Sequence, residues 1–169
     1  MSDYIVTQSV TDCIGCRACE AHCRLEHGKD EEAGLSYCQI IEVERKRGSM
    51  TQVNYVYLHC FHCTKPACVE VCPTGAMRRR VKDGIVYVEE KLCVGCKSCI
   101  TACSWAVPRW NTETGKVEKC DLCRARIDQG LEPACVTKCT TNCLTFSTTK
   151  KAFEKTRRAF AEKIVKHRD

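Results

Sequence analysis

The chain has 169 residues, 18 cysteines and a formal net charge of +6. Cysteine makes up about 11 % of the residues, and Leu, Ile, Val and Phe together only about a fifth, which is the lower limit for folding on apolar burial alone. An ordinary hydrophobic core is thereby excluded as the main source of stability. A membrane-spanning helix is also excluded, because no apolar run approaches the roughly 20 residues it needs.

The segment before the first cysteine has no features of a secretory leader. Residues 1–12 lack a basic region, an apolar stretch and a cleavage site, and Arg78-Arg79-Arg80 is internal. We therefore expect a cytoplasmic protein, where thiols stay reduced and bind metal more often than they form disulfides. A subunit without a leader can still be exported together with a partner that has one.

The predicted elements are short and alternate with cysteine groups. Branched and aromatic residues predict strands over 36–45 and 54–58, with a polar turn over 45–49. Asp83-Gly84 predicts a hairpin between strands over 77–82 and 85–88. Short helical turns are expected after the third cysteine of each group.

The C-terminal segment, residues 150–169, differs from the rest of the chain. It has no cysteine, glycine or proline, and it places Phe153, Phe160 and Ile164 on one helical face. It holds eight Lys or Arg against three Asp or Glu. These residues predict a basic helix packed on its own domain, with docking into a partner as the alternative.

Sixteen cysteines form four groups with repeated spacing. Groups one and three follow C-x2-C-x2-C-x3-C, group two C-x2-C-x4-C-x3-C and group four C-x2-C-x11-C-x3-C. In chain order the groups are Cys13, Cys16, Cys19, Cys23; Cys60, Cys63, Cys68, Cys72; Cys93, Cys96, Cys99, Cys103; and Cys120, Cys123, Cys135, Cys139.

Two cysteines, Cys38 and Cys143, remain outside the groups. Aligning the residues after Cys72 with those after Cys139 places Cys143 where the other copy has Ala76. Cys38 falls in a strand pattern and is expected to be a small buried apolar residue. We expect neither cysteine to be a ligand.

The spacing of groups one and three is the bacterial ferredoxin pattern, in which three cysteines hold one 4Fe-4S cluster and the fourth holds another. Gly15 and Gly95 suit the close backbone approach that such a loop needs. Four-cysteine zinc sites are the alternative, but zinc has no use for the third and fourth cysteines at these spacings. A disulfide scaffold conflicts with the expected compartment and the tight spacings.

The segments around these groups resemble the four-cluster iron-sulfur subunits of molybdenum and tungsten oxidoreductases. The family includes subunits of dimethyl sulfoxide reductase, polysulfide reductase, formate dehydrogenase, formate hydrogenlyase, hydrogen-dependent carbon dioxide reductase and tungsten aldehyde oxidoreductase. The resemblance covers residues 1 to about 148 and is carried by segments such as Cys60-Phe-His-Cys, Cys72-Pro-Thr-Gly-Ala, Lys119-Cys-Asp-Leu-Cys and Gly130-Leu-Glu-Pro-Ala-Cys-Val. It departs from the family pattern at Ser104 and Thr140, where proline is usual.

The resemblance implies an α+β fold of two fused 2x4Fe-4S ferredoxin modules, one inserted in the other, with a C-terminal helix. The four-cluster domain would span 1–149, with an inner module over about 54–108, an outer module of 1–53 plus 109–149, and a basic helix over 150–169. It implies four ligand sets: Cys13, Cys16, Cys19 and Cys139 (cluster A); Cys23, Cys120, Cys123 and Cys135 (cluster B); Cys60, Cys63, Cys68 and Cys103 (cluster C); Cys72, Cys93, Cys96 and Cys99 (cluster D). Spacing alone also allows pairing of groups one with two and three with four.

Nothing in the sequence indicates a catalytic centre. The histidines, His22, His27, His59, His62 and His167, lack nucleophile or carboxylate arrangements and are expected to pack or hydrogen-bond near clusters. We expect a non-catalytic electron-transfer subunit that links a molybdenum or tungsten pterin catalytic subunit to a flavin, hydrogenase or ferredoxin-type partner, with self-association into a longer wire possible. A free-standing polyferredoxin or maturation accessory is the alternative, and a structural zinc protein is the least favoured.

Charge near the ligands is a further expected control on cluster potential. Arg17, Lys65, Lys97, Lys119 and Lys138 lie between or beside ligands, and the alternative for each is a solvated surface charge. Each oxidised cluster with four thiolates carries about −2, so four clusters would change the formal +6 to about −2. Nucleic acid is therefore not an expected partner.

Overall fold

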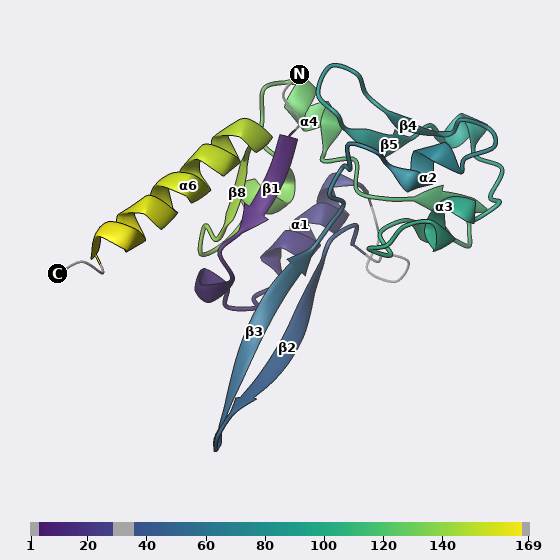
Figure 1. The fold of residues 1–169 in the computed structure, drawn as a ribbon. Helices are drawn as coiled ribbons and strands as arrows, with labels where there is room; N and C mark the ends of the chain where they lie inside the picture. Colours follow the sequence, from purple (N-terminus) through teal and green to yellow (C-terminus); the bar gives the residue numbers. More distant parts are fainter. Residues whose placement is uncertain (1–3, 29–35, 167–169) are drawn as a thin grey trace.

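The computed structural model describes residues 4–28 and 36–166. Within these residues, eight strands pair as four separate two-stranded antiparallel sheets, joined by short helices and loops (Figure 1). Mixed helix and strand agree with the expected α+β class. None of the sheets in these residues joins more than two strands, so the sheets and helices contact one another mainly around the loops that carry the cysteines.

The first and last strands pair with each other. Strand β1 (Tyr4–Gln8) runs antiparallel to β8 (Leu144–Thr148), with Val6 opposite Phe146. Helix α1 (Ala18–Glu26), which follows the 3-10 helix η1 (Val10–Asp12), packs against α5 (Ala134–Thr137). Cysteine groups one and four therefore lie together although they are far apart in sequence.

Groups two and three lie together in the same way. Helix α2 (Ala67–Glu70) packs against α3 (Ser98–Thr101) and against β4. Two hairpins complete this part of the fold: β4 (Met77–Arg79) with β5 (Val86–Val88), and β6 (Arg109–Asn111) with β7 (Lys116–Glu118). Between groups two and three runs η2 (Glu90–Leu92).

The hairpin predicted at Asp83-Gly84 is confirmed, although its strands are shorter than predicted. The Arg80 and Asp83 side chains form an ion pair at 2.6 Å, and the Gly84 N–H donates to the Arg80 carbonyl at 2.8 Å. These contacts close residues 80–84 into a turn, and the paired strands end at Arg79 and Val86. Gly84 takes a φ of 77°, which a glycine adopts without strain.

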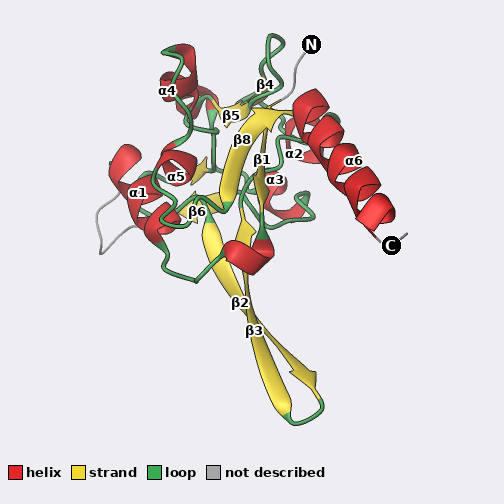
Figure 2. Ribbon diagram, turned by 90° about the vertical axis from the view of Figure 1, so that its left-hand side faces the viewer, coloured by secondary structure: helices red, strands yellow, loops and turns green. Residues whose placement is uncertain are grey.

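A long hairpin extends away from the cysteine loops (Figure 2). It consists of β2 (Gln39–Arg47) and β3 (Met50–Leu58), which confirms the two predicted strands and extends both toward the turn. The prediction was wrong at the start of the first strand, and Cys38 lies outside it. The reason is local: the Cys38 N–H bonds to the Ser36 Oγ at 3.3 Å, which bends the chain before pairing begins.

Cysteines supply much of the buried core. One cluster of buried side chains surrounds Val6, Ile40, Tyr57 and Leu144 and includes Cys19, Cys23, Cys38, Cys135 and Cys143. A second, smaller cluster holds Met77, Val86, Cys99 and Val117. Cys38 is 3 % exposed, as expected for a buried apolar residue.

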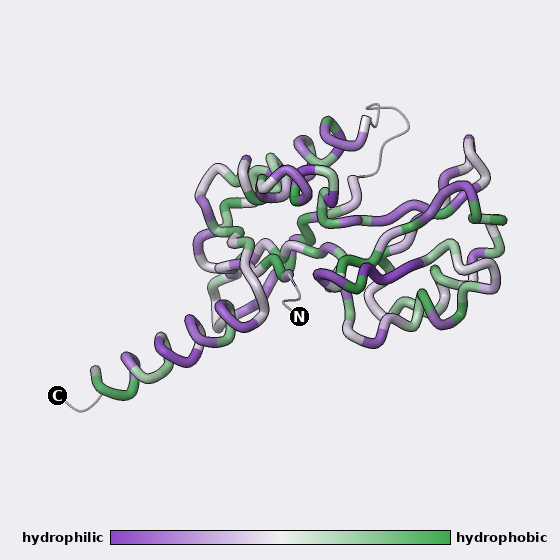
Figure 3. The backbone as a smooth tube through the Cα atoms, turned by 90° about the horizontal axis from the view of Figure 1, so that it is seen from above, coloured by the Kyte–Doolittle hydropathy of each residue, from purple (hydrophilic) through white to green (hydrophobic). Residues whose placement is uncertain are grey.

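The predicted C-terminal helix is confirmed as α6 (Thr149–Lys166), which contacts β1 and β8 and then extends away from the domain (Figure 3). The expected apolar face is not buried, since Phe153 and Phe160 are 63 % and 65 % exposed. The small side chains of Ala152 and Ala159 line the groove against the strands, together with part of Phe160. Among the described residues, no helix is long and apolar enough to cross a membrane.

Candidate metal centres

Each cysteine group combines a tight loop with the start of a short helix. The third cysteine is the second residue of its helix in every group: Cys19 in α1, Cys68 in α2, Cys99 in α3 and Cys135 in α5. The predicted helical turns are therefore confirmed, although each begins one residue before the third cysteine. This arrangement directs the first two thiols of a loop and the third thiol toward one space.

The loops of groups one and three have the same backbone conformation. Gly15 and Gly95 both have a φ of 71°, and the residues two places later, Arg17 and Lys97, are also left-handed. A Cβ on Gly15 would lie 2.5 Å from the Tyr55 ring, and one on Gly95 would lie 2.5 Å from the Gly115 carbonyl. Both glycines are required where a neighbour approaches closely, as the sequence predicted.

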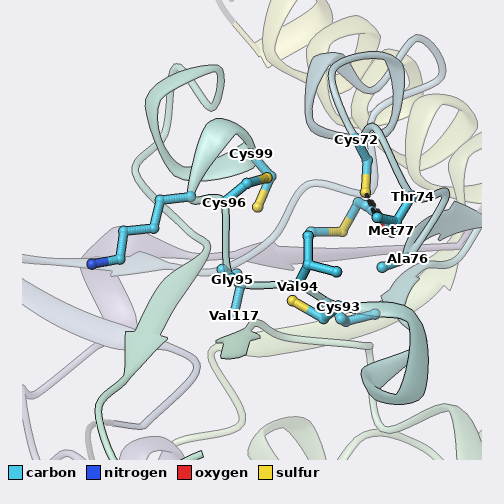
Figure 4. A pocket seen from close by; sticks show the side chains of 12 residues that line it. Cys72, Thr74, Ala76, Met77, Cys93, Val94, Gly95, Cys96, Cys99 and Val117 are labelled. Carbon is cyan, nitrogen blue, oxygen red and sulfur yellow. Dashed lines mark hydrogen bonds between the residues drawn. The ribbon is translucent and has the colours of Figure 1, made fainter. Parts of the chain in front are cut away.

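The side chains of Cys72, Cys93, Cys96 and Cys99 line one cavity (Figure 4). Apolar side chains, including Met77, Val94 and Val117, complete its wall. The backbone N–H of Met77 donates to the Cys72 Sγ at 3.3 Å. The cavity thus brings together the four cysteines that the resemblance assigns to cluster D.

A second cavity is lined by Cys13, Cys16, Cys19 and Cys139. These are the cysteines of cluster A, drawn from groups one and four. Cys143 also lines this cavity, and its Sγ lies 3.4 Å from the Cys139 Sγ. Ala76 occupies the matching place in the first cavity, which agrees with the alignment of the two segments.

A third cavity is lined by Cys23, Cys120, Cys123 and Cys135. These are the cysteines of cluster B. Three of them are less than 9 % exposed, and the side chains of Tyr57 and His59 complete the wall. Each of the three cavities thus contains the four cysteines of one set, and Cys38 also lines the third cavity as Cys143 lines the second. The repeated set of four cysteines supports the same kind of metal group in each cavity.

The four cysteines of cluster C are also neighbours. The thiol of Cys68 has its pKa raised to about 11, first by burial and then by the nearby Cys60, Cys103 and Cys63. The His62 N–H donates to the Cys60 Sγ at 3.4 Å. Thiols separated around a cavity, with backbone N–H donors to sulfur, suit an iron-sulfur cluster.

The surroundings of the thiols differ from cavity to cavity. Burial raises the pKa of Cys123 and Cys135 to about 12. At the exposed Cys16 and Cys96, hydrogen bonds with the side chains of Thr140 and Ser98, respectively, are the largest causes of a lowered pKa. Cluster binding requires deprotonated thiols. Deprotonation therefore costs more free energy at the buried thiols of the third cavity than at the exposed Cys16 and Cys96.

Two histidines contact ligand thiols. The Nε2 atoms of His27 and His62 lie 3.8 Å from the Cys123 Sγ and 3.9 Å from the Cys120 Sγ, respectively. Hydrogen bonding near clusters was the expected role of the histidines, and these two fulfil it. His167 lies outside the described residues.

The five cationic residues expected near the ligands separate into two kinds. Lys119 is only 4 % exposed, whereas Arg17, Lys65, Lys97 and Lys138 are exposed. Tyr57, which hydrogen-bonds the Cys135 thiol, was missed because an aromatic residue in a strand pattern carries no mark of its position. Among the described residues, no three His, Cys, Asp or Glu side chains converge closely enough to hold a single metal ion.

Comparison with known proteins gives two family matches of the same description. A 4Fe-4S dicluster domain model matches residues 51–149, and another matches residues 12–76. The chain is 38 % identical over 142 residues to the probable anaerobic dimethyl sulfoxide reductase chain YnfG of Escherichia coli, covering 79 % of this chain and 68 % of that protein.

Two further relatives extend the comparison. The thiosulfate reductase electron transfer subunit PhsB of Salmonella typhi is 36 % identical over 146 residues, covering 86 % of this chain and 76 % of that protein. Protein NrfC of Escherichia coli is 44 % identical over 137 residues, covering 79 % of this chain and 60 % of that protein.

Proposed function

The chain belongs to the 4Fe-4S dicluster family of iron-sulfur proteins, and from this premise we propose that it is the electron-transfer subunit of a molybdenum or tungsten pterin oxidoreductase. Its relatives include a reductase electron transfer subunit and chains of dimethyl sulfoxide reductases. In this role it relays single electrons between the pterin catalytic subunit and a second redox partner of flavin, hydrogenase or ferredoxin type. The chemistry belongs to the clusters, while the protein spaces them, excludes water and sets their potentials.

The proposal includes four 4Fe-4S clusters held by the sixteen cysteines of sets A to D. The observation that carries it is the set of three similar cavities, each lined by the four cysteines of one set. The neighbouring thiols around Cys68 support the fourth set. Cys38 and Cys143 are not ligands in this proposal.

The two modules are proposed to be nested. Packing of α1 on α5 and of α2 on α3 supports an outer module of 1–53 plus 109–149 and an inner module over about 54–108, and opposes the pairing of groups one with two. Electrons would then pass in the order A, B, C, D. Besides burial, the nearby Cys60 thiol raises the pKa of Cys120, and the nearby Cys68 thiol raises the pKa of Cys99. This closeness supports cluster B beside cluster C and cluster C beside cluster D.

Metal analysis of anaerobically purified protein tests the cofactor. We expect a brown protein with about 16 iron atoms per chain. A Cys38→Ala variant is the matched control and should keep the full iron content, because Cys38 belongs to none of the proposed ligand sets although it lines the third cavity. A colourless preparation that contains zinc would overturn the proposal.

Iron content also tests the pairing of groups. Cys72→Ala and Cys96→Ala each remove one ligand of cluster D, so each variant should lose about four iron atoms, and the double variant no more. Combining Cys16→Ala with Cys96→Ala should cost twice as much, because these thiols belong to clusters A and D. Additive loss for the Cys72 and Cys96 pair would contradict the nested arrangement.

Native mass spectrometry of the complex purified from its source tests the partners. We expect a catalytic subunit that carries a pterin cofactor and at least one further redox subunit. Recovery of the chain alone would favour a free-standing polyferredoxin, and masses that correspond to two or more copies of the chain would show self-association.

We also propose that the complex is cytoplasmic, because dense free thiols persist in a reducing compartment. Cell fractionation tests this location.

A further inference from the structure

His62 contacts thiols of two different proposed clusters. Its backbone N–H donates to the Cys60 Sγ at 3.4 Å, and its ring Nε2 lies 3.9 Å from the Cys120 Sγ. Cys60 belongs to cluster C in the inner module, and Cys120 belongs to cluster B in the outer module. The residue is 6 % exposed and has a φ of 46°, a conformation that few residues other than glycine adopt.

The hydrogen bonds around the ring determine where its proton lies. The Val86 N–H donates to the His62 Nδ1 at 2.9 Å, so Nδ1 uses its lone pair as an acceptor. In a neutral imidazole the proton is then on Nε2, which faces Cys120. The side chain therefore donates to one cluster ligand while the backbone of the same residue donates to another.

Lys119 provides a buried charge at the same place. Its Nζ donates to the carbonyl oxygens of Val86 and Cys120. No carboxylate among the described residues forms an ion pair with it. Burial raises the pKa of the Cys68 and Cys120 thiols, and the charge of Lys119 opposes that rise. These two thiols belong to clusters C and B, respectively. A buried cation without a carboxylate partner is expensive unless another negative charge compensates it.

We propose that His62 and Lys119 form the junction through which electrons pass between the inner and outer modules. His62 is the hydrogen-bonded bridge between the Cys60 and Cys120 ligands, and Lys119 stabilises the added electron on either cluster. In each transfer one electron leaves one cluster, which is oxidised, and reduces the other; no covalent bond or proton changes place. This inference rests on the proposed function.

Redox titration followed by electron paramagnetic resonance tests Lys119. In Lys119→Gln the reduced to oxidised ratio of two of the four clusters, at fixed potential, should fall by roughly tenfold, which corresponds to about 59 mV for one electron. Lys119→Arg should restore the wild-type potentials. Lys65→Gln is the matched control, since it removes an exposed charge two residues after Cys63, and should change none.

Flash reduction tests the bridge through the rate of electron transfer between clusters. His62→Phe keeps a ring but removes the Nε2–H donor, and should slow transfer between clusters B and C by roughly tenfold. His27→Phe is the matched control, because His27 contacts Cys123 of cluster B but no thiol of cluster C. It should shift the potential of one cluster and, at matched driving force, slow transfer between clusters B and C much less than His62→Phe does.

The outcomes separate this inference from the proposed function. Wild-type protein without clusters would overturn both. Clusters at full iron content, with an unchanged rate in His62→Phe or equal slowing in His27→Phe, would overturn the junction alone. Because His62→Phe leaves the Val86 N–H without its acceptor, it can lose iron. In that case Lys119→Gln decides: a shift confined to two clusters supports the junction, and an equal shift of all four or no shift refutes it.

Discussion

The middle of the molecule and its two ends place cysteine side chains in different environments. In the middle, Cys23, Cys123 and Cys135 are buried, and histidine, tyrosine and lysine side chains approach the thiols. At the ends, Cys16 and Cys96 are exposed. In the proposed function, the buried donors would set cluster potential and support transfer within the chain, while the exposed cysteines would allow electrons to enter and leave.

The exposed ends also share an apolar residue. Ile14 and Val94 occupy the same place in their loops and are 60 % and 67 % exposed. An apolar residue beside an exposed ligand suits close contact with a partner, because it excludes water from the path. We therefore expect loss of a cysteine in the middle to destabilise the whole protein, and loss of a cysteine at an end to affect only the nearest cluster.

Removal of all iron should have the largest effect. The core relies on cysteines, so the metal-free chain should lose most of its helix and strand content, because metal binding and folding are coupled. Far-ultraviolet circular dichroism before and after anaerobic chelation measures this. Retained secondary structure and compactness would show that the apolar residues fold the chain unaided.

A single ligand substitution in the middle should cost more than one at an end. Cys120→Ala should destabilise the whole protein and lower the yield of folded material severalfold, since it leaves three buried thiols and Lys119 without a compensating cluster. Cys96→Ala should lose about four iron atoms and leave the other clusters intact. Iron content and thermal unfolding of both variants would show equal losses if the distinction is wrong.

Glycine substitutions give an intermediate effect. Gly95→Ala combines an unfavourable positive φ, worth roughly 1–2 kcal/mol, with a Cβ that meets a backbone oxygen, so cluster D should become labile. Gly75→Ala is the control, because its φ is 63° but no atom lies within 4 Å of the added Cβ. The rate of iron release to a chelator should rise for Gly95→Ala and change much less for Gly75→Ala.

The smallest effect is expected at a surface contact between the modules. Asp128 on α4 (Arg124–Asp128) pairs with Lys82 at 2.7 Å and with Arg80 at 2.8 Å, and these hydrogen bonds lower its pKa. Its stabilising contribution is therefore present above the ordinary pKa and is lost as pH falls through the lowered one. Asp128→Asn should lower the melting temperature slightly at low salt and not at high salt. A large decrease would assign this contact a structural role.

The sequence predicted the features that depend on local chemistry. Cysteine spacing anticipated the loops and helix starts, and Asp83-Gly84 anticipated a hairpin. The sequence could not distinguish Lys119 from Lys65, because both lie close to a cysteine in the chain. Lys119 is buried only by the fold, in which its Nζ donates to the Val86 carbonyl. The role of His62 was equally hidden, since its second contact is with a residue 58 positions later.

The pairing of β1 with β8 has a consequence for synthesis. Cys103 would complete the proposed inner ligand sets while 66 of the 169 residues (169 − 103) are still to be made, whereas the outer sets wait for Cys135 and Cys139. The first strand likewise has no described partner until Leu144–Thr148 leaves the ribosome. With the proposed ligand sets, inner clusters would be loaded onto a nascent chain, and outer clusters only near its release. The amino-terminal thiols would spend that interval open to oxidation, so we expect oxygen during synthesis to damage the outer clusters more than the inner ones.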